Sequence, residues 1–480
     1  MPAEPFLRRQ PLPSIRDRAD ARLGALIEAA DRGKHRWRLA RTGWERALNG
    51  RPGDWASGSF APRPGNRLDV HVDGVDALRA ICDAVAGARD HVHVAGWTVT
   101  PGFVMRRDPE IVTLRELLAE AATRARVRVL VWAGAPLGVF HPSRGETRAA
   151  MRELTAGTGI RGALDSRSRP MHCHHEKLVI VDGEVAFVGG IDLTDVAGDR
   201  LDSRHHDHRA ALGWHDSASE LHGPAVADVA AHFALRWQAT TGEQLPPAAP
   251  PAAAGPSRVQ VVRTVPEKTY DRLRGGDFSI LEAYLRALRS AQRLVYAENQ
   301  FLWSAEVVAV LCEKLREPPS DDFRMCLVLP RRPNNGNDDT RGQLGVLLES
   351  DRQHRLLVGT IGPPGRDHPD VYVHSKIAVV DDRWLTIGSA NLNEHSLFND
   401  TEVNVVSDDP ELARRTRERL WTEHLAEECA GRDPVAVVEE RWRPVLSGAT
   451  VPPTPLRRLP SLSRRSSRLF GPLNGLVVDG

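Results

Sequence analysis

Two short segments place a histidine and a lysine two positions apart, each directly before an apolar run. His175 and Lys177 precede "LVIV", and His374 and Lys376 precede "IAVV". Side chains two positions apart on a strand project from the same face, so each pair presents an imidazole and an ammonium group together. A histidine can attack phosphorus or donate a proton, and a lysine can stabilise charge on phosphate oxygens. Each segment therefore predicts half of a site for a phosphate ester, and this chemistry requires neither a metal nor a cofactor.

Both segments are copies of one longer pattern. Beyond the lysine, each copy continues with an aspartate, two small residues and a final Asp or Asn at the same spacing. The first copy contains Asp182, Gly189, Gly190 and Asp192, and the second contains Asp381, Gly388, Ser389 and Asn391. A single histidine–lysine pair arises by chance in many chains, whereas a long pattern repeated at matched spacing does not. We therefore predict an internal duplication in which each half supplies one pair to a shared site.

The aspartate of each copy is predicted to be a turn residue. It falls seven positions after the histidine, which breaks the alternation of a strand, and Asp182 is followed by glycine in "VDGEV". An Asp-Gly dipeptide between two apolar runs is typical of a hairpin turn. We expect Asp182 and Asp381 to fix these hairpins and to take no part in the chemistry.

Donors for a phosphate are predicted where the second apolar run of each copy ends. The Gly-Gly and Gly-Ser pairs offer backbone N–H groups, and serine and asparagine side chains add further donors. The predicted substrate-binding residues are Gly190, Ser389 and Asn391. Asp192 takes the place of Asn391 in the first copy, and because a carboxylate has no proton to donate, a structural role is favoured over a role in the site.

Strand-like and helical patterns alternate on both sides of a Pro/Ala-rich segment, "LPPAAPPAAAGPS". The strand-like runs include "RVRVLVW" and "RMCLVLP", and the helical patterns include "TLRELLAEAATRA" and "SILEAYLRALRSA". This alternation predicts an α/β fold made of two similar α/β/α sandwich lobes, with the active site at their interface. The expected divisions are a helical lead-in (1–64), a first lobe (65–244), a linker (245–257), a second lobe (258–445) and a basic tail (446–480).

Composition limits the classes of partner. The 480 residues include 64 Lys and Arg against 63 Asp and Glu, a net charge of +1, so there is no global field to gather a nucleic acid. Five cysteines without C-x-x-C spacing indicate neither a disulfide framework nor a zinc ribbon. No apolar run reaches the length of a signal peptide core or a membrane span. We expect a cytoplasmic protein, in solution or peripheral to a membrane.

Three further segments give weaker signals. The run "SRHHDHR" (203–209) crowds imidazoles and a carboxylate as a metal site would, but it lacks helical ligand spacing and a loop is favoured. Glu298, Asn299 and Gln300 either line the mouth of the site or cap a strand. The tail "LRRLPSLSRRSSRLFGPLNGLVV" mixes arginines with apolar residues, so it either binds an anionic membrane or packs as an ordinary tail.

The complete pattern H-x-K-x4-D-x6-G-[GS]-x-[ND], present twice, resembles the duplicated HKD signature of the phospholipase D superfamily. The segments "VHVAGWTVTPGF", "GWHDSASELHGPAVADVAAHFALRW" and "VYAENQFLW" look like the lipid-hydrolysing branch of that family. The resemblance extends from about Arg67 to Val406. It implies two α/β/α lobes with the site between them, a phosphohistidine intermediate, and release to water or an alcohol.

The resemblance also implies a role for each catalytic residue. His175 matches the nucleophile and His374 matches the general acid. Asp216 in "GWHD" matches the carboxylate partner of His374, and Glu402 in "NDTEVNVV" matches that of His175, each from the opposite lobe. A carboxylate behind an imidazole fixes its tautomer and stabilises its charged form, which agrees with these roles.

The expected function is hydrolysis of a glycerophospholipid at a membrane surface to phosphatidic acid and a head-group alcohol. Head-group exchange is expected when an alcohol replaces water, and a monomer is expected because both copies lie in one chain. The alternatives are a cardiolipin synthase-like phosphatidyltransferase, a nucleic-acid phosphodiesterase and a phosphate-binding module without turnover. The near-zero net charge speaks against nucleic acid, and two intact histidine–lysine pairs speak against a module without turnover.

Overall fold

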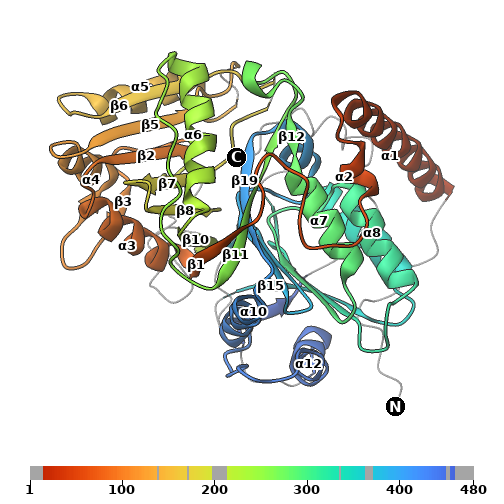
Figure 1. Cartoon of the computed structure of the whole chain (residues 1–480). Helices are drawn as coiled ribbons and strands as arrows, with labels where there is room; N and C mark the ends of the chain where they lie inside the picture. Colours follow the sequence, from red (N-terminus) through yellow and green to blue (C-terminus); the bar gives the residue numbers. More distant parts are fainter. Residues whose placement is uncertain are drawn as a thin grey trace.

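The computed structural model describes residues 15–137, 140–169, 172–196, 213–333, 337–362, 371–449 and 454–459. Figure 1 shows two α/β halves side by side, with the N-terminal helices α1 (Ile15–Thr42) and α2 (Glu45–Asn49) against the second half. We call residues 63–241 lobe one and residues 257–458 lobe two. Residues 245–256 form neither helix nor strand.

Lobe one begins with a strand and a helix, and further helices follow β4, β5 and β10. Its strands are β1 (Arg63–Val72), β2 (His91–Gly96), β3 (Val104–Arg106), β4 (Val112–Thr113), β5 (Arg126–Trp132), β6 (Arg161–Asp165), β7 (Leu178–Val181), β8 (Val185–Gly189), β9 (Trp214–His215) and β10 (Ser217–His222). Its helices are α3 (Asp73–Ala86), α4 (Leu114–Ala121), α5 (Arg144–Thr155) and α6 (Val226–Thr241).

Lobe two repeats this order. Its strands are β11 (Ser257–Val265), β12 (Asp277–Phe278), β13 (Leu294–Glu298), β14 (Arg324–Val328), β15 (Leu356–Ile361), β16 (Tyr372–Val373), β17 (Ile377–Val380), β18 (Trp384–Gly388), β19 (Glu402–Ser407) and β20 (Leu456–Arg458). Its α-helices are α7 (Ser279–Ser290), α8 (Ala305–Arg316), α9 (Asn337–Ser350), α10 (Pro410–Leu425), α11 (Pro434–Val437) and α12 (Arg443–Ser447). One 3-10 turn (Asp271–Leu273) and two π-helical turns (His395–Asn399 and Val438–Trp442) complete it.

A single mixed sheet runs through both lobes and repeats one strand order. It reads β1-β10-β8-β7-β2-β5-β6 in lobe one and β11-β19-β18-β17-β13-β14-β15 in lobe two. The halves meet edge to edge where β1 pairs with β11, at Arg63–Val259 and Asn66–Ser257. The predicted two-lobed α/β fold with an internal duplication is therefore confirmed, and the structure adds that the two sheets are continuous.

Helices cover both faces of the sheet because successive strand residues bury alternate faces. In β7, Leu178 and Ile180 join a central core shared by both lobes, whereas Val179 and Val181 join an outer core with α3, α4 and α5. Strand β17 is divided in the same way, with Ala378 and Val380 in the outer core of lobe two. Helices α6 and α10 contribute to the central core.

The helix boundaries follow local capping chemistry. Thr113 and Glu116 form a capping box at the start of α4, within the predicted helical run "TLRELLAEAATRA". Ser143 and Glu146 do the same for α5. Asp409 caps α10 ahead of proline at the first helical position, which is the preferred place for that residue.

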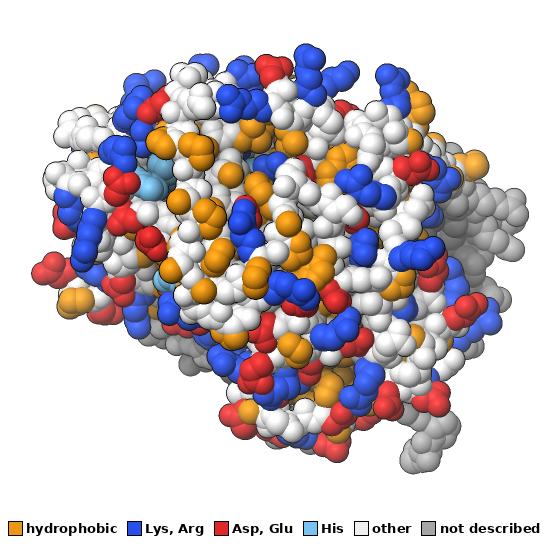
Figure 2. All heavy atoms as spheres, in the orientation of Figure 1, with side chains coloured by type: hydrophobic (Ala, Val, Ile, Leu, Met, Phe, Trp, Pro, Cys, Tyr) orange, Lys and Arg blue, Asp and Glu red, His pale blue; other side chains and the backbone are white. Residues whose placement is uncertain are grey.

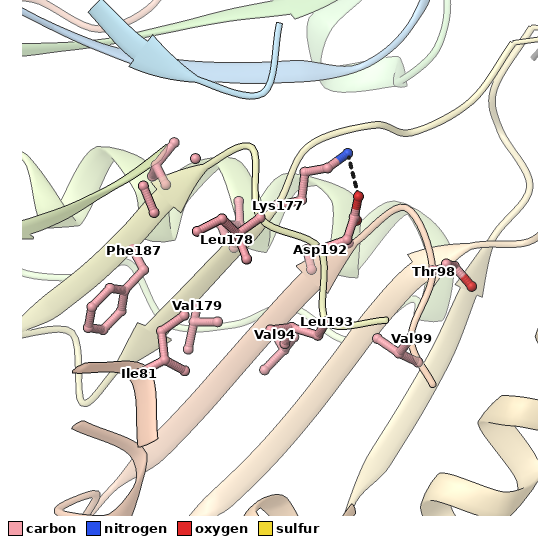
Figure 3. A pocket seen from close by; sticks show the side chains of 16 residues that line it. Ile81, Val94, Thr98, Val99, Lys177, Leu178, Val179, Phe187, Asp192 and Leu193 are labelled. Atoms are coloured by element: carbon pink, nitrogen blue, oxygen red, sulfur yellow. Dashed lines mark ion pairs between the residues drawn. The ribbon is translucent and has the colours of Figure 1, made fainter. Parts of the chain in front are cut away.

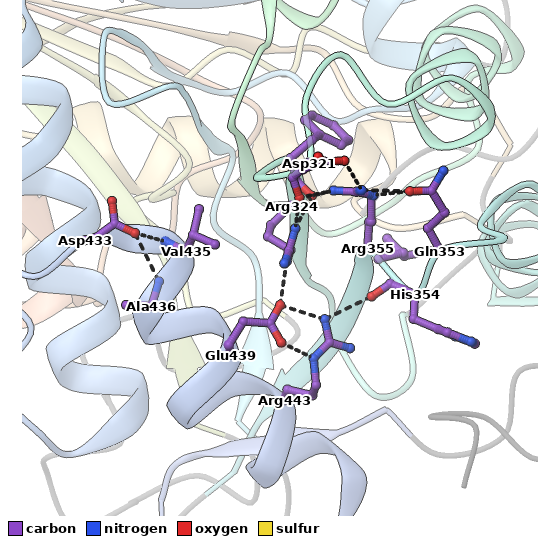
Figure 4. A network of polar contacts seen from close by, with 12 residues as sticks. Asp321, Arg324, Gln353, His354, Arg355, Asp433, Val435, Ala436, Glu439 and Arg443 are labelled. Atoms are coloured by element: carbon purple, nitrogen blue, oxygen red, sulfur yellow. Dashed lines mark hydrogen bonds and ion pairs between the residues drawn. The ribbon is translucent and has the colours of Figure 1, made fainter. Parts of the chain in front are cut away.

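The chain ends of the described structure are fixed to lobe two. In α1, His35 binds Glu306 at 2.8 Å. At the other end β20 pairs with β15, and Figure 4 shows Glu439 joining Arg324 (2.5 Å) and Arg443 (2.6 Å). Residues 460–480, which include most of the predicted basic tail, lie outside the described residues, as does the run 203–209.

The surface shows no dominant charge sign on the face in view. Figure 2 shows Lys and Arg side chains interspersed with Asp and Glu, with apolar side chains between them. Among the described residues, no helix combines the length and apolar character needed to span a bilayer.

Candidate active site

The two lobes exchange the same backbone hydrogen bonds at the start of each histidine–lysine segment. In lobe one, the N–H groups of His175 and Glu176 donate to the Thr401 carbonyl at 2.9 and 3.1 Å. In lobe two, the N–H groups of His374 and Ser375 donate to the His215 carbonyl at 2.8 and 3.1 Å. Each segment is thus held by the other lobe, and the two copies are related by an approximate twofold arrangement.

Each histidine is paired with a carboxylate from the opposite lobe. His175 Nδ1 lies 2.9 Å from Glu402 Oε1, and His374 Nδ1 lies 2.6 Å from Asp216 Oδ2. All four side chains are buried. Because Nδ1 is engaged with a carboxylate in both rings, Nε2 is the nitrogen that is suited to act on a substrate.

The carboxylates are themselves held in place. Ser396 Oγ donates to Glu402 Oε1 at 2.6 Å, and Ser389 Oγ donates to Glu402 Oε2. The backbone N–H of Ser217 donates to Asp216 Oδ1 at 2.8 Å. Burial raises the pKa of the Glu402 carboxyl well above its usual value, against the opposing effect of the Lys177 charge.

The two lysines differ in their partners. Lys177 Nζ donates to the His175 carbonyl at 2.6 Å and lies 3.3 Å from Asp192 Oδ2. Lys376 Nζ donates to the His374 carbonyl and, at 3.2 Å, to the Gln300 side-chain oxygen. That oxygen also accepts from Asn391 Nδ2 at 3.3 Å. Asp192 is thus the ion partner of a buried lysine, and its structural role stays a prediction.

The pKa of Lys376 is set mainly by its burial. Burial lowers it to about 7; the nearby Asp216 charge opposes this shift and Lys177 adds to it. Charges from both lobes, those of Asp216, Lys177, Glu402 and Asp192, act on this one ammonium group. This agrees with the prediction of a site shared by the two lobes.

Two predicted phosphate donors have other roles in the structure. The Gly190 N–H donates to the Ser217 carbonyl at 2.9 Å, and the Ser389 N–H donates to the Val403 carbonyl at 3.0 Å. The Ser389 hydroxyl is directed at Glu402. A Cβ added at Gly190 would lie 2.1 Å from Asp216 Oδ1, so the glycine makes room for that carboxylate. The donors predicted at Gly190 and Ser389 are therefore engaged within the protein, whereas Asn391 lies beside the lysine, and the substrate-binding role of the three residues stays a prediction.

The structure places Asp182 and Asp381 in the hairpin turns. Both have positive φ, 54° and 53°. The Asp182 carboxylate accepts three backbone N–H groups, each at 2.8 Å, from residues 89–91 at the start of β2. The Asp381 carboxylate accepts the equivalent groups of residues 292–294 at 2.7–2.8 Å. Each aspartate thereby ties the hairpin to the neighbouring strand, away from the lysines.

Sequence reasoning did not identify several polar residues at the lobe interface. Ser217 Oγ and Ser375 Oγ lie 2.9 Å apart, and each follows a member of the His374–Asp216 pair. His215 Nε2 binds Glu298 Oε2 at 2.8 Å, so Glu298 lies behind the site and not at its mouth. For Ser217, Ser375 and His215 the available signal was their position directly next to the predicted catalytic residues.

The other two residues of the segment 298–300 have different roles: Asn299 holds neighbouring loops, and Gln300 contacts a lysine of the candidate site. Asn299 Oδ1 accepts the N–H groups of Phe301 and Leu392 at 3.1 and 3.0 Å, which fixes the loops around it. Gln300, as shown above, contacts Lys376 directly. Only this third residue therefore faces the converging polar groups.

An apolar cavity lies behind Lys177 in lobe one. Figure 3 shows Ile81, Val94 and Phe187 on its walls and the Lys177–Asp192 ion pair at its edge. These walls belong to the outer core of the lobe. They keep the surroundings of the ion pair apolar, which strengthens the attraction between the two charges.

Comparison with known proteins gives a consistent result for both halves. The family profile described as "Phospholipase D" matches residues 84–213, and the profile described as "Cardiolipin synthase, PLD-like domain" matches residues 284–423. Each match contains one histidine–lysine pair. The chain belongs to the phospholipase D superfamily. The predicted family is thus confirmed. The prediction of an enzyme of a phosphodiesterase family is confirmed with it.

The phospholipase D relatives are longer than this chain. Phospholipase D A of Dictyostelium discoideum is 26% identical over 471 residues, covering 76% of this chain and 36% of the relative. Phospholipase D2 of Bos taurus is 26% identical, covering 74% of this chain and 51% of the relative. A crystal structure of phosphatidylserine synthase from Haemophilus influenzae shares the fold, with a TM-score of 0.52 and 12% identity over 80% of this chain and 90% of that chain.

Proposed function

We propose that this phospholipase D superfamily member transfers the phosphatidyl group of a glycerophospholipid to water or to an alcohol. The observation that carries the proposal is the pair of cross-lobe contacts, His175–Glu402 and His374–Asp216, beside two buried lysines. A phosphodiester transfer needs a nucleophile, an acid and positive charge at the non-bridging oxygens, and these residues supply all three.

The reaction proceeds in two displacements. His175 Nε2 attacks phosphorus, the bond from phosphorus to the head-group oxygen breaks, and protonated His374 gives its proton to that oxygen. Water or an alcohol then attacks the phosphohistidine, loses its proton to His374, and the bond from phosphorus to His175 breaks. Lys177, Lys376 and the Asn391 amide stabilise the phosphoryl oxygens, and no cofactor takes part.

Transfer to a lipid acceptor is the second candidate. The match of residues 284–423 to a profile named for cardiolipin synthase favours it, and the same residues would act. The two candidates differ only in the acceptor. We further propose that the chain acts as a monomer, and that it is a cytoplasmic protein that binds a membrane surface. Residues 245–257 are proposed as the linker between the lobes. Nucleic acid is not proposed as a substrate.

The test is incubation of the purified chain with mixed phospholipids and a short primary alcohol, followed by mass spectrometry of the lipids. We expect phosphatidic acid together with a new phosphatidyl-alcohol. Accumulation of a lipid dimer with little phosphatidic acid would identify the second candidate. Cleavage of DNA by a protein that leaves every lipid unchanged would contradict the proposal.

Lysine variants give the matched controls for this assay. Lys177→Met and Lys376→Met should each lower turnover by about a hundredfold or more, because a donor to the transferring phosphoryl group is lost. Lys268→Met removes an exposed lysine and should leave turnover unchanged. Near-normal turnover in either of the first two variants would remove that lysine from the phosphate site.

A further inference from the structure

A second group of titratable side chains joins the lobes next to the catalytic pairs. His172 of lobe one faces His395 and Asp400 of lobe two. His172 Nδ1 lies 3.1 Å from His395 Nδ1 and 3.4 Å from Asp400 Oδ1. His395 and Asp400 are buried, and the His172 side chain is 12% exposed. The proposed phosphatidyl transfer uses none of these three residues.

These distances match the spacing of ligands around a zinc-type ion. Ligand atoms about 2.0–2.1 Å from a tetrahedral ion lie about 3.3 Å from one another. The two distances from His172 Nδ1 lie within a few tenths of an ångström of this value. Two imidazole nitrogens and one carboxylate oxygen are ligands that Zn²⁺ accepts, and three protein ligands leave a fourth position for water.

The surroundings hold the three groups in place. The backbone N–H of Cys173 donates to Asp400 Oδ1 at 2.9 Å, and the Trp303 ring packs edge-on against His395. Asp400 Oδ2 is buried and lacks a hydrogen-bond partner in the part of the chain that the structure describes. A buried carboxylate oxygen without a partner is costly in a folded protein, and a cation bound by this carboxylate would offset part of that cost.

A second buried cluster provides a contrast. His215, Glu298 and His424 also lie close together, but His215 Nε2 and His424 Nε2 contact different oxygens of Glu298, at 2.8 and 2.6 Å. These are hydrogen-bond distances, shorter than the separation of ligands around an ion. The other nitrogen of His215 binds Asp73 at 2.8 Å. This cluster is closed by short hydrogen bonds, whereas the two distances from His172 Nδ1, 3.1 and 3.4 Å, are also long enough for ligands of one ion.

We propose that His172, His395 and Asp400 bind one divalent transition-metal ion of the zinc type and so join the two lobes. His172 lies three residues before His175, and Asp400 lies two residues before Glu402. The ion would therefore hold together the two segments that carry one catalytic pair. It is separate from the phosphoryl chemistry, so turnover should persist in chelator-treated protein.

The experiment measures metal binding directly, without reference to catalysis. Full-length protein stripped with EDTA is dialysed against Zn²⁺ and analysed for bound metal, and the visible absorption of its Co²⁺ form is recorded. We expect one ion per chain, the intense absorption of four-coordinate Co²⁺, and a rise in Tm with Zn²⁺. His172→Ala and Asp400→Asn should each weaken binding tenfold or more and abolish the Tm rise.

The control is His141→Ala, which removes an exposed histidine that is paired with Glu146 in lobe one and should bind Zn²⁺ as the wild type does. Asp400→Asn keeps the shape of the side chain, so its fold should survive. The proposal would be overturned by wild-type protein that binds no Zn²⁺, or by unchanged affinity in either site variant. Either result would leave a histidine–histidine hydrogen bond at this position. Zn²⁺ binding without a Tm rise would overturn the joining of the lobes.

Discussion

The two lysines that are proposed to contact the phosphate differ in their polar partners. Lys177 has the Asp192 carboxylate at 3.3 Å, whereas Lys376 has the neutral amide of Gln300 at 3.2 Å, with Asn391 on the same oxygen. Burial of Lys376 lowers its pKa to about 7. The exchange of Asp for Asn between the two copies of the motif therefore leaves Lys376 without the adjacent carboxylate that Lys177 has.

A pH profile tests this difference. Below its pKa Lys376 is charged and can stabilise a phosphate, so kcat/KM should fall as pH rises through about 7. A bound diester anion favours the charged lysine, which should move the same limb in kcat to higher pH. Asn391→Asp should move the fall in kcat/KM to a higher pH, by about one pH unit or more, because a nearby carboxylate favours the charged lysine. An unchanged limb in that variant would contradict the assignment to Lys376.

Within the site, the sequence predicted the residues better than their contacts. The i, i+2 spacing predicted that His374 and Lys376 would act together, although the strand expected there begins only after the lysine, because residues 374–376 lie between β16 and β17. Ser389 was predicted as a phosphate donor from its place in the Gly-Ser turn. Its contact with Glu402, across the β18–β19 pair, could not be predicted because it depends on the fold. Gln300 lies far from both motif copies in sequence, and only the fold brings its side chain to Lys376.

At the level of elements, each catalytic segment is positioned by a hairpin that an aspartate ties to the next strand. Asp182 has φ of 54° and accepts three backbone N–H groups. Asp tolerates this left-handed conformation better than most residues, and its charge strengthens the hydrogen bonds.

Asp182→Ala should therefore lower the free energy of unfolding by about 2 kcal/mol or more. Urea unfolding provides the measurement, and Glu184→Ala, at an exposed position in the same turn, is the control and should change little. Turnover per folded molecule should stay near wild type, because the turn lies at the end of β7 remote from the site. A loss of turnover in stable Asp182→Ala protein would instead assign this residue to the chemistry.

Strands and helices were the most predictable elements. The run "SILEAYLRALRSA" forms α7, and "RVRVLVW" is β5. Short elements could not be predicted from the sequence. Strands β9 and β16 are two residues each and form because Trp214 and Tyr372 pair in parallel across the lobes. A contact between such distant segments leaves no periodic signal along the chain.

At the scale of the whole molecule, a buried network joins the lobes behind His374. His215 of lobe one binds Asp73 and, across the interface, Glu298, which also binds His424. Burial alone would lower the pKa of His215, but the Glu298 and Asp73 charges raise it to about 10. The imidazole is therefore charged in the folded protein at neutral pH.

This network predicts a pH dependence of stability. The pKa of His215 in the unfolded chain is about 6.5. Its raised folded value stabilises the protein fully below that pH, and the contribution is lost as pH rises toward 10. Glu298→Gln should lower the free energy of unfolding at neutral pH by about 3–5 kcal/mol, because a buried charge loses its partner.

Urea unfolding of both proteins between pH 6 and about 10 measures the effect. The difference in the free energy of unfolding between wild type and Glu298→Gln should shrink toward high pH. His35, whose pKa is also raised, to about 9, is paired with other carboxylates, so its contribution is the same in both proteins and cancels in this difference. A difference that is constant with pH would show that the His215 charge does not contribute.

The arrangement of two lobes around one site was predictable because the motif occurs twice in one chain. The pairing of each histidine with a carboxylate of the other lobe came from the family resemblance, since spacing alone gives no partner. The contact between His172 and His395 had no signal at all, because these residues belong to neither motif and meet only when the lobes close.

The most direct test of the shared site uses a diester with a nitrophenolate leaving group, which departs without needing a proton. His374→Ala should hydrolyse a natural diester roughly 10²–10⁴-fold more slowly, yet release a burst of nitrophenol and retain an acid-labile phosphoryl group on His175. His175→Ala should give neither burst nor label. A burst and a label on His374 in the His175→Ala protein, absent from His374→Ala, would contradict the assignment of nucleophile and acid, and a burst in both variants would contradict the single shared site.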